Sequence, residues 1–157
     1  MINILFVCMG NICRSPTAEI IFGAHVAREG LSDLISVDSA GTGNWHVGNP
    51  PDDRAINIAK LLGHEIGHLE ARQVRINDFG KFDYILAMDK SNLYDLTAMA
   101  PESFGGHLSL LLDFSDEESG DVPDPYYGDL SDYDRVIEMV DPASAGLLRH
   151  IRNKHEF

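Results

Sequence analysis

Short apolar runs alternate along the chain with stretches that have helical spacing. Runs typical of β-strands occupy residues 2–7, 34–38, 82–88 and 107–114. The first run is nearly continuous in apolar residues, which is typical of a parallel strand buried on both faces. Residues 17–28, 52–62, 91–99 and 131–153 combine helix-forming residues with apolar positions three or four apart, so they are predicted to be helices. Gly30 and Gly63 close the first two helices.

The remaining segments are expected to be irregular. Residues 39–51 are rich in glycine, asparagine and proline, residues 74–81 are short and irregular, and residues 115–129 are acidic and contain proline. Alternating strands and helices indicate right-handed β-α-β units. We therefore expect one domain over residues 1–157, an α/β, flavodoxin-like fold with a four-stranded parallel sheet and helices on both faces. Ligands of such sheets bind beyond the carboxyl ends of the strands.

Composition narrows the possible functions. The formal net charge of −13 and the isoelectric point of about 4.7 argue against non-specific nucleic-acid binding, which needs a cationic face. A local cationic pocket is still allowed, because net charge and local field are separate properties. The longest apolar run is far shorter than a bilayer span, and no basic leader precedes the first strand. With two cysteines and no disulfide scaffold, the sequence favours a cytoplasmic protein that does not bind a membrane.

A chemically specific motif joins the first strand to the first helix. Residues 8–16 read Cys-Met-Gly-Asn-Ile-Cys-Arg-Ser-Pro. A tight loop before a helix directs backbone N–H groups and the positive end of the helix dipole at one anion. Cys8 is then placed to attack a phosphate-sized anion, and Arg14 to hold two of its oxygens. The same positive surroundings favour a reactive thiolate.

Each neighbouring residue has a predicted role. Gly10 is expected to supply a positive φ angle, and Asn11 also tolerates left-handed geometry. Ser15 suits the N-cap and Pro16 the first helical position, although the Ser15 hydroxyl could instead donate to the Cys8 sulfur.

Cys13 either pairs with Cys8 under oxidation or fills space. A lone cysteine at a strand end is usually a core residue, but its combination with Arg14, glycine and Ser-Pro argues against coincidence.

The motif at residues 7–16 resembles the phosphate loop of low-molecular-weight protein tyrosine phosphatases. Similarity to this family extends over nearly the whole chain, through residues 38–43, 45–48, 71–73, 82–89 and 122–128. The resemblance implies a bacterial-type member that hydrolyses phosphotyrosine in proteins and small aryl phosphates. It also implies a cysteinyl-phosphate intermediate and a phosphotyrosine protein or peptide as the partner.

The resemblance assigns roles to individual residues. Cys8 is the nucleophile, Arg14 clamps the phosphate, and Asp124 is the general acid and then the general base. Taken alone, Asp124 could equally be a solvated acid of its acidic loop; its place between Pro123 and Pro125 stiffens the backbone there. The implied phosphate-binding residues are Met9, Gly10, Asn11, Ile12, Cys13, Arg14 and Ser15. Asn11, Ser15 and Ser39 are implied to support the loop.

Aromatic residues are expected to select the substrate. Met9, Trp45, Tyr126 and Tyr127 correspond to positions that flank the substrate ring in the family. A deep slot would exclude phosphoserine, because its phosphate could not reach the loop. Trp45 could alternatively be an ordinary core residue.

One position departs from the family pattern. The family usually places a histidine two residues before Ala71-Arg72-Gln73, whereas this chain has Leu69 there and His68 one place earlier. Either the local backbone shifts by one residue, or the hydrogen bond that the histidine would make is missing and Leu69 packs in its place. His68 is therefore not included in the predicted site.

No cofactor or metal is expected, because the seven histidines are scattered and the loop supplies the positive charge. A monomer is expected, with a weak dimer as the alternative.

Other functions remain as alternatives. Arsenate reductases of this fold need two further cysteines, and none follows Cys13. Arginine phosphatases of this fold carry threonine at the position of Ile12. A non-catalytic phosphotyrosine-binding module would be expected to lack Cys8, Arg14 or Asp124.

Overall fold

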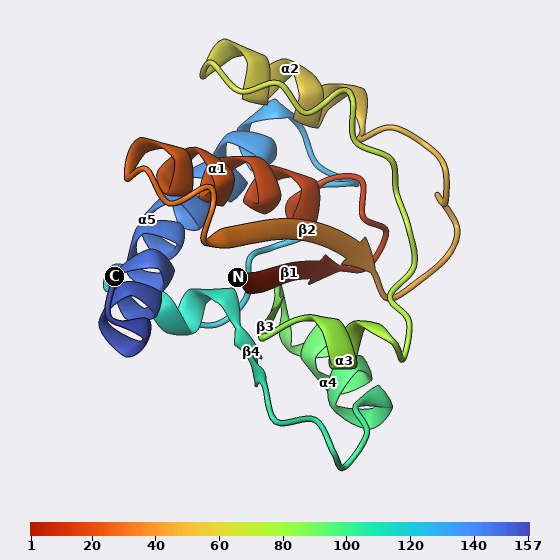
Figure 1. Ribbon diagram of the computed structural model, residues 1–157. Helices are drawn as coiled ribbons and strands as arrows, with labels where there is room; N and C mark the ends of the chain where they lie inside the picture. Colours follow the sequence, from red (N-terminus) through yellow and green to blue (C-terminus); the bar gives the residue numbers. More distant parts are fainter.

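A four-stranded parallel sheet forms the centre of the molecule (Figure 1). The computed structural model describes all 157 residues. The strands are β1 (Ile2–Cys8), β2 (Ile35–Gly41), β3 (Tyr84–Ala87) and β4 (His107–Leu110), in the order β2-β1-β3-β4. β1 pairs with β2 from Ile2 opposite Ile35 to Cys8 opposite Gly41. The predicted single-domain α/β fold is confirmed, with the chain's central strand leading into the cysteine motif.

Helices cover both faces of the sheet. They are α1 (Arg14–Arg28), α2 (Asp53–Leu61), α3 (Asp78–Lys81), α4 (Lys90–Met99) and α5 (Leu130–His155), with a 3-10 helix, η1, at Leu111–Phe114. α1 and α5 pack on one face, and α3 and α4 lie on the other (Figure 1). α2 lies farther from the sheet and contacts α5. None of the helices combines the length and apolar composition needed to cross a bilayer.

The directions of the β1 side chains explain its nearly continuous apolar run. Ile4, Phe6 and Cys8 point into the core beneath α1 and α5, whereas Leu5 and Val7 point into the core beneath α3 and α4. Each of these side chains is buried. Burial of one large aliphatic or aromatic side chain contributes about 1.5–3 kcal/mol, so both faces of β1 stabilise its position.

Several predicted boundaries are wrong. Residues 39–41 continue β2, α1 begins at Arg14, and residues 78–81 form a short helix. The fourth strand ends at Leu110 rather than residue 114, and η1 follows it. Leu111 and Leu112 both enter the core beneath α1 and α5, which strand alternation would not allow. Gly146 of α5 permits this turn to pack closely, because an added Cβ would lie 1.8 Å from the Phe114 carbonyl oxygen.

Candidate active site

The loop between β1 and α1 encloses the Cys8 sulfur with hydrogen-bonding groups. The Asn11 backbone N–H donates to Cys8 Sγ at 3.2 Å, and Ser15 Oγ lies 3.0 Å from the same sulfur. Backbone bonds from Thr42 to the Cys8 carbonyl and from Gly43 to the Met9 carbonyl, both 2.9 Å, hold the loop against the end of β2. The sulfur therefore lies at the carboxyl end of the central strand and at the amino end of α1.

The tight turn of this loop depends on Asn11 rather than Gly10. Asn11 has a φ angle of 57°, whereas Gly10 is not among the residues with positive φ. Asparagine is one of the few side chains that adopt this left-handed region readily. Gly10 instead leaves room for a neighbouring ring, because an added Cβ would lie 3.0 Å from His46 Cδ2. The prediction of positive φ at Gly10 was wrong, and that at Asn11 is confirmed.

Ser15 does not cap α1. The helix begins at Arg14 with Cys13 as its N-cap, and no side chain caps it. The Ser15 hydroxyl is used inside the loop, where it contacts Cys8 Sγ and accepts a 2.8 Å hydrogen bond from Asn11 Nδ2. Pro16 is the third helical residue, and its missing N–H removes no helical bond because the first turn has no partners for those groups. The contact with Cys8 Sγ that was expected as the alternative is present, and the same hydroxyl also donates to the Ala40 carbonyl at 3.3 Å.

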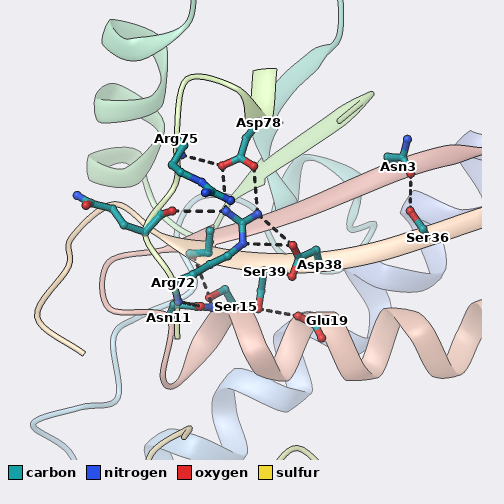
Figure 2. A network of polar contacts seen from close by, with 12 residues as sticks. Asn3, Asn11, Ser15, Glu19, Ser36, Asp38, Ser39, Arg72, Arg75 and Asp78 are labelled. Atoms are coloured by element: carbon teal, nitrogen blue, oxygen red, sulfur yellow. Dashed lines mark hydrogen bonds and ion pairs between the residues drawn. The ribbon is translucent and has the colours of Figure 1, made fainter. Parts of the chain in front are cut away.

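Asn11 is the centre of a buried polar network (Figure 2). Its Nδ2 also donates to Ser39 Oγ at 2.9 Å, and its Oδ1 accepts from the Arg72 backbone N–H at 2.9 Å. The structure thus brings together Asn11, Ser15 and Ser39, the residues predicted to support the loop. The side-chain amide of Asn11 has all its hydrogen-bonding groups in use without a histidine.

Leu69 therefore acts as a packing residue. It is half-buried against a cluster that contains Ile12 and residues of α2. His68 is exposed and takes no part in the network. Of the two explanations for the departure at Leu69, apolar packing is the one found.

Two acidic residues fix the segment that supplies the Arg72 N–H. The Arg72 guanidinium donates to Asp38 Oδ2 at 3.0 Å and to Asp78 Oδ2 at 3.1 Å (Figure 2). Asp78 also accepts from the Arg75 backbone at 2.7 Å. These bonds connect β2, the segment before α3 and α3 itself, so the backbone that reaches Asn11 is held from two sides.

Glu19 extends the network on the α1 side. Ser39 Oγ donates to Glu19 Oε1 at 2.7 Å (Figure 2). Burial is the largest influence on this carboxyl and raises the pKa of Glu19 to about 7, with the Asp38 carboxylate adding to the effect. The hydrogen bond from Ser39 and the charge of Arg72 oppose that rise. Glu19 is therefore partly protonated near neutral pH.

We expect Glu19→Gln to change how stability depends on pH. The native state binds the Glu19 proton more tightly than the unfolded chain does, so wild-type stability falls as pH rises from about 4.5 through about 7. Glutamine keeps an oxygen for Ser39 and does not titrate. The variant should therefore gain about 1–3 kcal/mol relative to wild type between pH 5 and pH 8. Urea unfolding at both pH values measures the difference.

Glu102→Gln is the matched control, because Glu102 is an exposed carboxylate in the loop after α4. Its unfolding free energy should follow that of wild type across the same pH range. Parallel curves for Glu19→Gln and wild type would show that Glu19 does not hold an unusual proton.

Arg14 is buried with one edge of its guanidinium anchored. Its Nη1 donates to Asp89 Oδ2 at 2.5 Å and to the Val122 carbonyl at 3.1 Å. Its Nη2 lies 3.6 Å from Asp124 Oδ2, and its buried Nε has no hydrogen-bond partner. A buried charged donor without a partner is costly, so the Nε and Nη2 edge is suited to a bidentate oxyanion.

Asp89 was expected to follow the third strand at the edge of the sheet where the site lies, but no role was predicted for it. Besides holding Arg14, it caps α4 by accepting a 2.7 Å bond from the Asn92 backbone. Its place directly after the third strand was the available signal, since ligands bind at that edge of a parallel sheet. Its pairing with Arg14, 75 residues away, could be seen only in the fold.

The acidic loop, residues 115–129, brings Asp124 to Arg14. Asp124 Oδ1 accepts from the Tyr126 backbone N–H at 3.1 Å, which leaves Oδ2 directed toward Arg14. A backbone bond from Val122 to the Met88 carbonyl at 2.8 Å fixes the loop to the end of β3. The side chain of Asp124 is 37% exposed, so it can exchange protons with solvent.

A cavity of about 440 Å³ opens over Cys8. Its lining residues are Cys8, Met9, Gly10, Ile12, Cys13, Arg14, Trp45, His46, Asp124, Tyr126 and Tyr127. Asn11, Ser15 and Ser39 are not part of the lining and support the loop from behind. His46 was not predicted as a site residue, although it adjoins Trp45 in a segment that resembles the family.

Aromatic side chains form the outer wall of this cavity. Trp45 is 69% exposed, so the expectation that it could be a core residue is wrong. Its ring lies over Gly43, where an added Cβ would come within 1.7 Å of the indole. Tyr126 and Tyr127 pack edge to face with ring centroids 4.9 Å apart. The lining therefore changes from polar at Cys8 and Arg14 to aromatic at the opening.

Cys13, the second cysteine of the loop, is a buried thiol. Burial raises the pKa of the Cys13 thiol to about 12. Its sulfur lies 3.5 Å from the Tyr133 hydroxyl, and both cysteines are free thiols. Cys13 is therefore a neutral thiol at physiological pH.

Comparisons with known proteins show which family the chain is similar to. Residues 3–156 match the family model for "Low molecular weight phosphotyrosine protein phosphatase". The protein "Low molecular weight protein-tyrosine-phosphatase YfkJ" of Bacillus subtilis is 42% identical, over 99% of each chain, and its crystal structure superposes with a TM-score of 0.91 over 98% of this chain and 96% of that one.

Two other solved structures are also similar. A protein tyrosine phosphatase from Entamoeba histolytica, with Hepes in its active site, is 35% identical and has a TM-score of 0.95 over 99% of each chain. A structure described as a Drosophila arginine phosphatase is 34% identical and has a TM-score of 0.89 over 95% of this chain and 97% of that one. The extent of the family match and the identity to its named members lead to one conclusion. This chain belongs to the low molecular weight protein-tyrosine-phosphatase family of hydrolases.

Proposed function

We propose that this chain hydrolyses phosphotyrosine in proteins, and small aryl phosphates, through a cysteinyl-phosphate formed on Cys8. The observation that carries the proposal is the free edge of the Arg14 guanidinium, which lies beside Cys8 and Asp124 in one cavity. Two phosphate oxygens can bind Nε and Nη2 while Asp89 holds Nη1. That arrangement supports an anion bound directly above the sulfur.

In the first step, the Cys8 thiolate attacks phosphorus opposite the leaving oxygen. The S–P bond forms as the P–O bond to the aryl group breaks, and Asp124 gives its proton to the departing phenolate. The Asn11 N–H and the Ser15 hydroxyl are within hydrogen-bonding distance of the sulfur and stabilise its negative charge. Arg14 and the loop N–H groups, from Met9 to Ser15, stabilise the charge on the transferred phosphoryl group.

In the second step, water hydrolyses the cysteinyl-phosphate. Asp124, now a carboxylate, accepts a proton from water as the water oxygen attacks phosphorus. The S–P bond breaks, which releases orthophosphate and restores the Cys8 thiolate. The proton taken up by Asp124 is the one it donates in the next cycle, so the protein ends unchanged.

The wall of the cavity supports an aryl substrate. Met9, Trp45, Tyr126 and Tyr127 lie between the phosphate-binding end and solvent, where they can pack on a phenyl ring. Phosphoarginine is the second candidate, because a solved structure described as an arginine phosphatase shares the fold. The lining residue Ile12 supports phosphotyrosine, because the resemblance noted in the sequence implies threonine at this position in arginine phosphatases. The lack of any cysteine after Cys13 disfavours arsenate reduction.

A panel of phosphopeptides tests the proposal. Peptides of one sequence that carry phosphotyrosine, phosphoserine or phosphoarginine are compared by release of inorganic phosphate. We expect kcat/KM for phosphotyrosine to exceed that for phosphoserine by at least about 10²-fold, because the shorter side chain leaves the phosphate short of Arg14. Turnover of p-nitrophenyl phosphate provides the reference rate.

Other results would replace the proposal. A higher kcat/KM for phosphoarginine would identify an arginine phosphatase. Tight binding of phosphotyrosine without phosphate release would identify a binding module. The inactive Cys8→Ser protein, purified in parallel, controls for contaminating phosphatases.

The chemistry also bears on where the enzyme works. A thiolate nucleophile needs a reducing compartment, which supports a cytoplasmic location. The cavity is built from residues of one chain, which supports activity as a monomer.

A further inference from the structure

Arg54 lies on α2, outside the cavity, and contacts the loop that carries Asp124. Its Nη2 donates to the Tyr126 carbonyl at 2.8 Å, and its Nη1 donates to the Gly128 carbonyl at 3.1 Å. The other hydrogen bonds of residues 125–128 are local, from Gly128 to the Pro125 carbonyl and from Tyr126 to Asp124. Arg54 therefore supplies the hydrogen bonds that tie this part of the acidic loop to another element.

Asp52 holds the Arg54 guanidinium in place. Asp52 Oδ1 accepts from Arg54 Nε at 3.0 Å, and Oδ2 accepts from Nη2 at 3.0 Å. The same carboxylate caps α2 through a 2.9 Å bond from the Arg54 backbone. These hydrogen bonds from Arg54 hold the pKa of the Asp52 carboxyl below its ordinary value, so the pair is charged.

The same pair is connected to the phosphate loop. The Asp52 backbone N–H donates to the Ile12 carbonyl at 2.8 Å. The Arg54 guanidinium also lies 5.8 Å from the ring centroid of Tyr126, a residue of the cavity wall, and 4.8 Å from that of Tyr133. One Asp–Arg unit thus joins the backbone of the phosphate loop, at Ile12, to the backbone of the acidic loop at Tyr126, two residues after Asp124.

We propose that Arg54, held by Asp52, is a positioning residue that sets where Asp124 lies relative to the phosphate on Cys8. The inference rests on the proposed function, because it takes Asp124 as the proton donor. Arginine suits this task because its planar fork donates to two carbonyls and a carboxylate together, whereas a lysine ammonium lacks that fixed geometry. A small displacement of a catalytic group is sufficient to slow a reaction strongly.

The basicity of the leaving group separates positioning from general damage. Phenolate is a basic leaving group that needs the proton from Asp124, whereas 2,4-dinitrophenolate leaves readily without one. The ratio kcat/KM reports steps up to cleavage of the P–O bond, so it isolates the first role of Asp124. Its second role, as base toward water, is common to all substrates and enters kcat.

The test compares Arg54→Lys with wild type on phenyl phosphate and 2,4-dinitrophenyl phosphate. We expect kcat/KM for phenyl phosphate to fall roughly 10- to 100-fold. We expect kcat/KM for 2,4-dinitrophenyl phosphate to stay within about threefold, because that step needs no acid. Vanadate affinity should be unchanged. Arg152→Lys is the matched control, since Arg152 is an exposed arginine paired with Glu29 near the C-terminus.

Asp52→Asn is the second variant, in case Arg54→Lys folds poorly. It keeps an oxygen to cap α2 but loses the charge that holds the guanidinium, so it should show the same dependence on leaving group. An equal loss of kcat/KM on both substrates, or no loss on either, in these variants would overturn the role of Arg54.

Asp124→Asn separates the two proposals. If Asp124→Asn shows no dependence on leaving group, the assignment of Asp124 as acid fails whatever Arg54 does. If Asp124→Asn shows the dependence and folded Arg54→Lys and Asp52→Asn do not, only the positioning role is wrong.

Discussion

Replacement of Cys8 by serine should abolish hydrolysis of p-nitrophenyl phosphate while leaving vanadate or phosphate binding intact. The hydroxyl of serine is a weak nucleophile unless a neighbouring base removes its proton, and the nearest side-chain partner here is the Ser15 hydroxyl. We expect kcat to fall by at least about 10⁴-fold. The anion-binding edge of Arg14 and the loop N–H groups are unchanged, so vanadate should still bind, as measured by calorimetry.

Cys13→Ser is the matched comparison, because it makes the same atomic change five residues later in the same loop. Cys13 is a neutral thiol whose sulfur contacts Tyr133, so its loss should leave turnover readily measurable. Turnover at the wild-type rate in Cys8→Ser would remove the proposed nucleophile.

Replacement of Asp124 by alanine should slow hydrolysis of phenyl phosphate by about 10²- to 10⁴-fold. The variant loses the proton donor for the leaving phenolate and the base for the attacking water. Steady-state kcat on phenyl phosphate and on a phosphotyrosine peptide measures the loss. The carboxylate of Asp124 also lies 3.6 Å from Arg14, so its removal should not weaken binding of an anion there.

Asp116→Ala provides the control, because Asp116 is in the same acidic loop but pairs with Arg149 at the surface. Its kcat should match wild type. If the two alanine variants have similar rates, the proton comes from another group and the second half of the mechanism must be reassigned.

Features that depend on neighbouring residues were predicted well from the sequence. The apolar run before Cys8 gave a buried central strand, and Gly30 and Gly63 both follow their helices with positive φ angles, as expected. The residue with left-handed geometry in the phosphate loop was not predicted uniquely, because glycine and asparagine both tolerate that geometry. The structure places it at Asn11, whereas Gly10 leaves room for the His46 ring.

The predicted use of Ser15 failed for a related reason. A serine before Pro is a strong local signal for an N-cap. A hydroxyl has only one proton to donate and two lone pairs to accept with, so contacts elsewhere compete with the cap. In the fold, Cys8 Sγ, Asn11 Nδ2 and the Ala40 carbonyl are its partners, and the helix starts at Arg14, two residues before Pro16, without a side-chain cap. Tertiary contacts therefore outweighed the local preference.

The sequence by itself determined the alternation of strands and helices, the edge of the sheet where Cys8 and Asp124 meet, and the resemblance that assigns them roles. Only the tertiary structure decided that Asp89 anchors Arg14 and that Arg54 connects α2 to the acidic loop. The reason is physical: local patterns constrain backbone conformation over a few residues, whereas these side chains find partners 75 and 72 residues away. Such pairs exist only after the sheet and helices have packed.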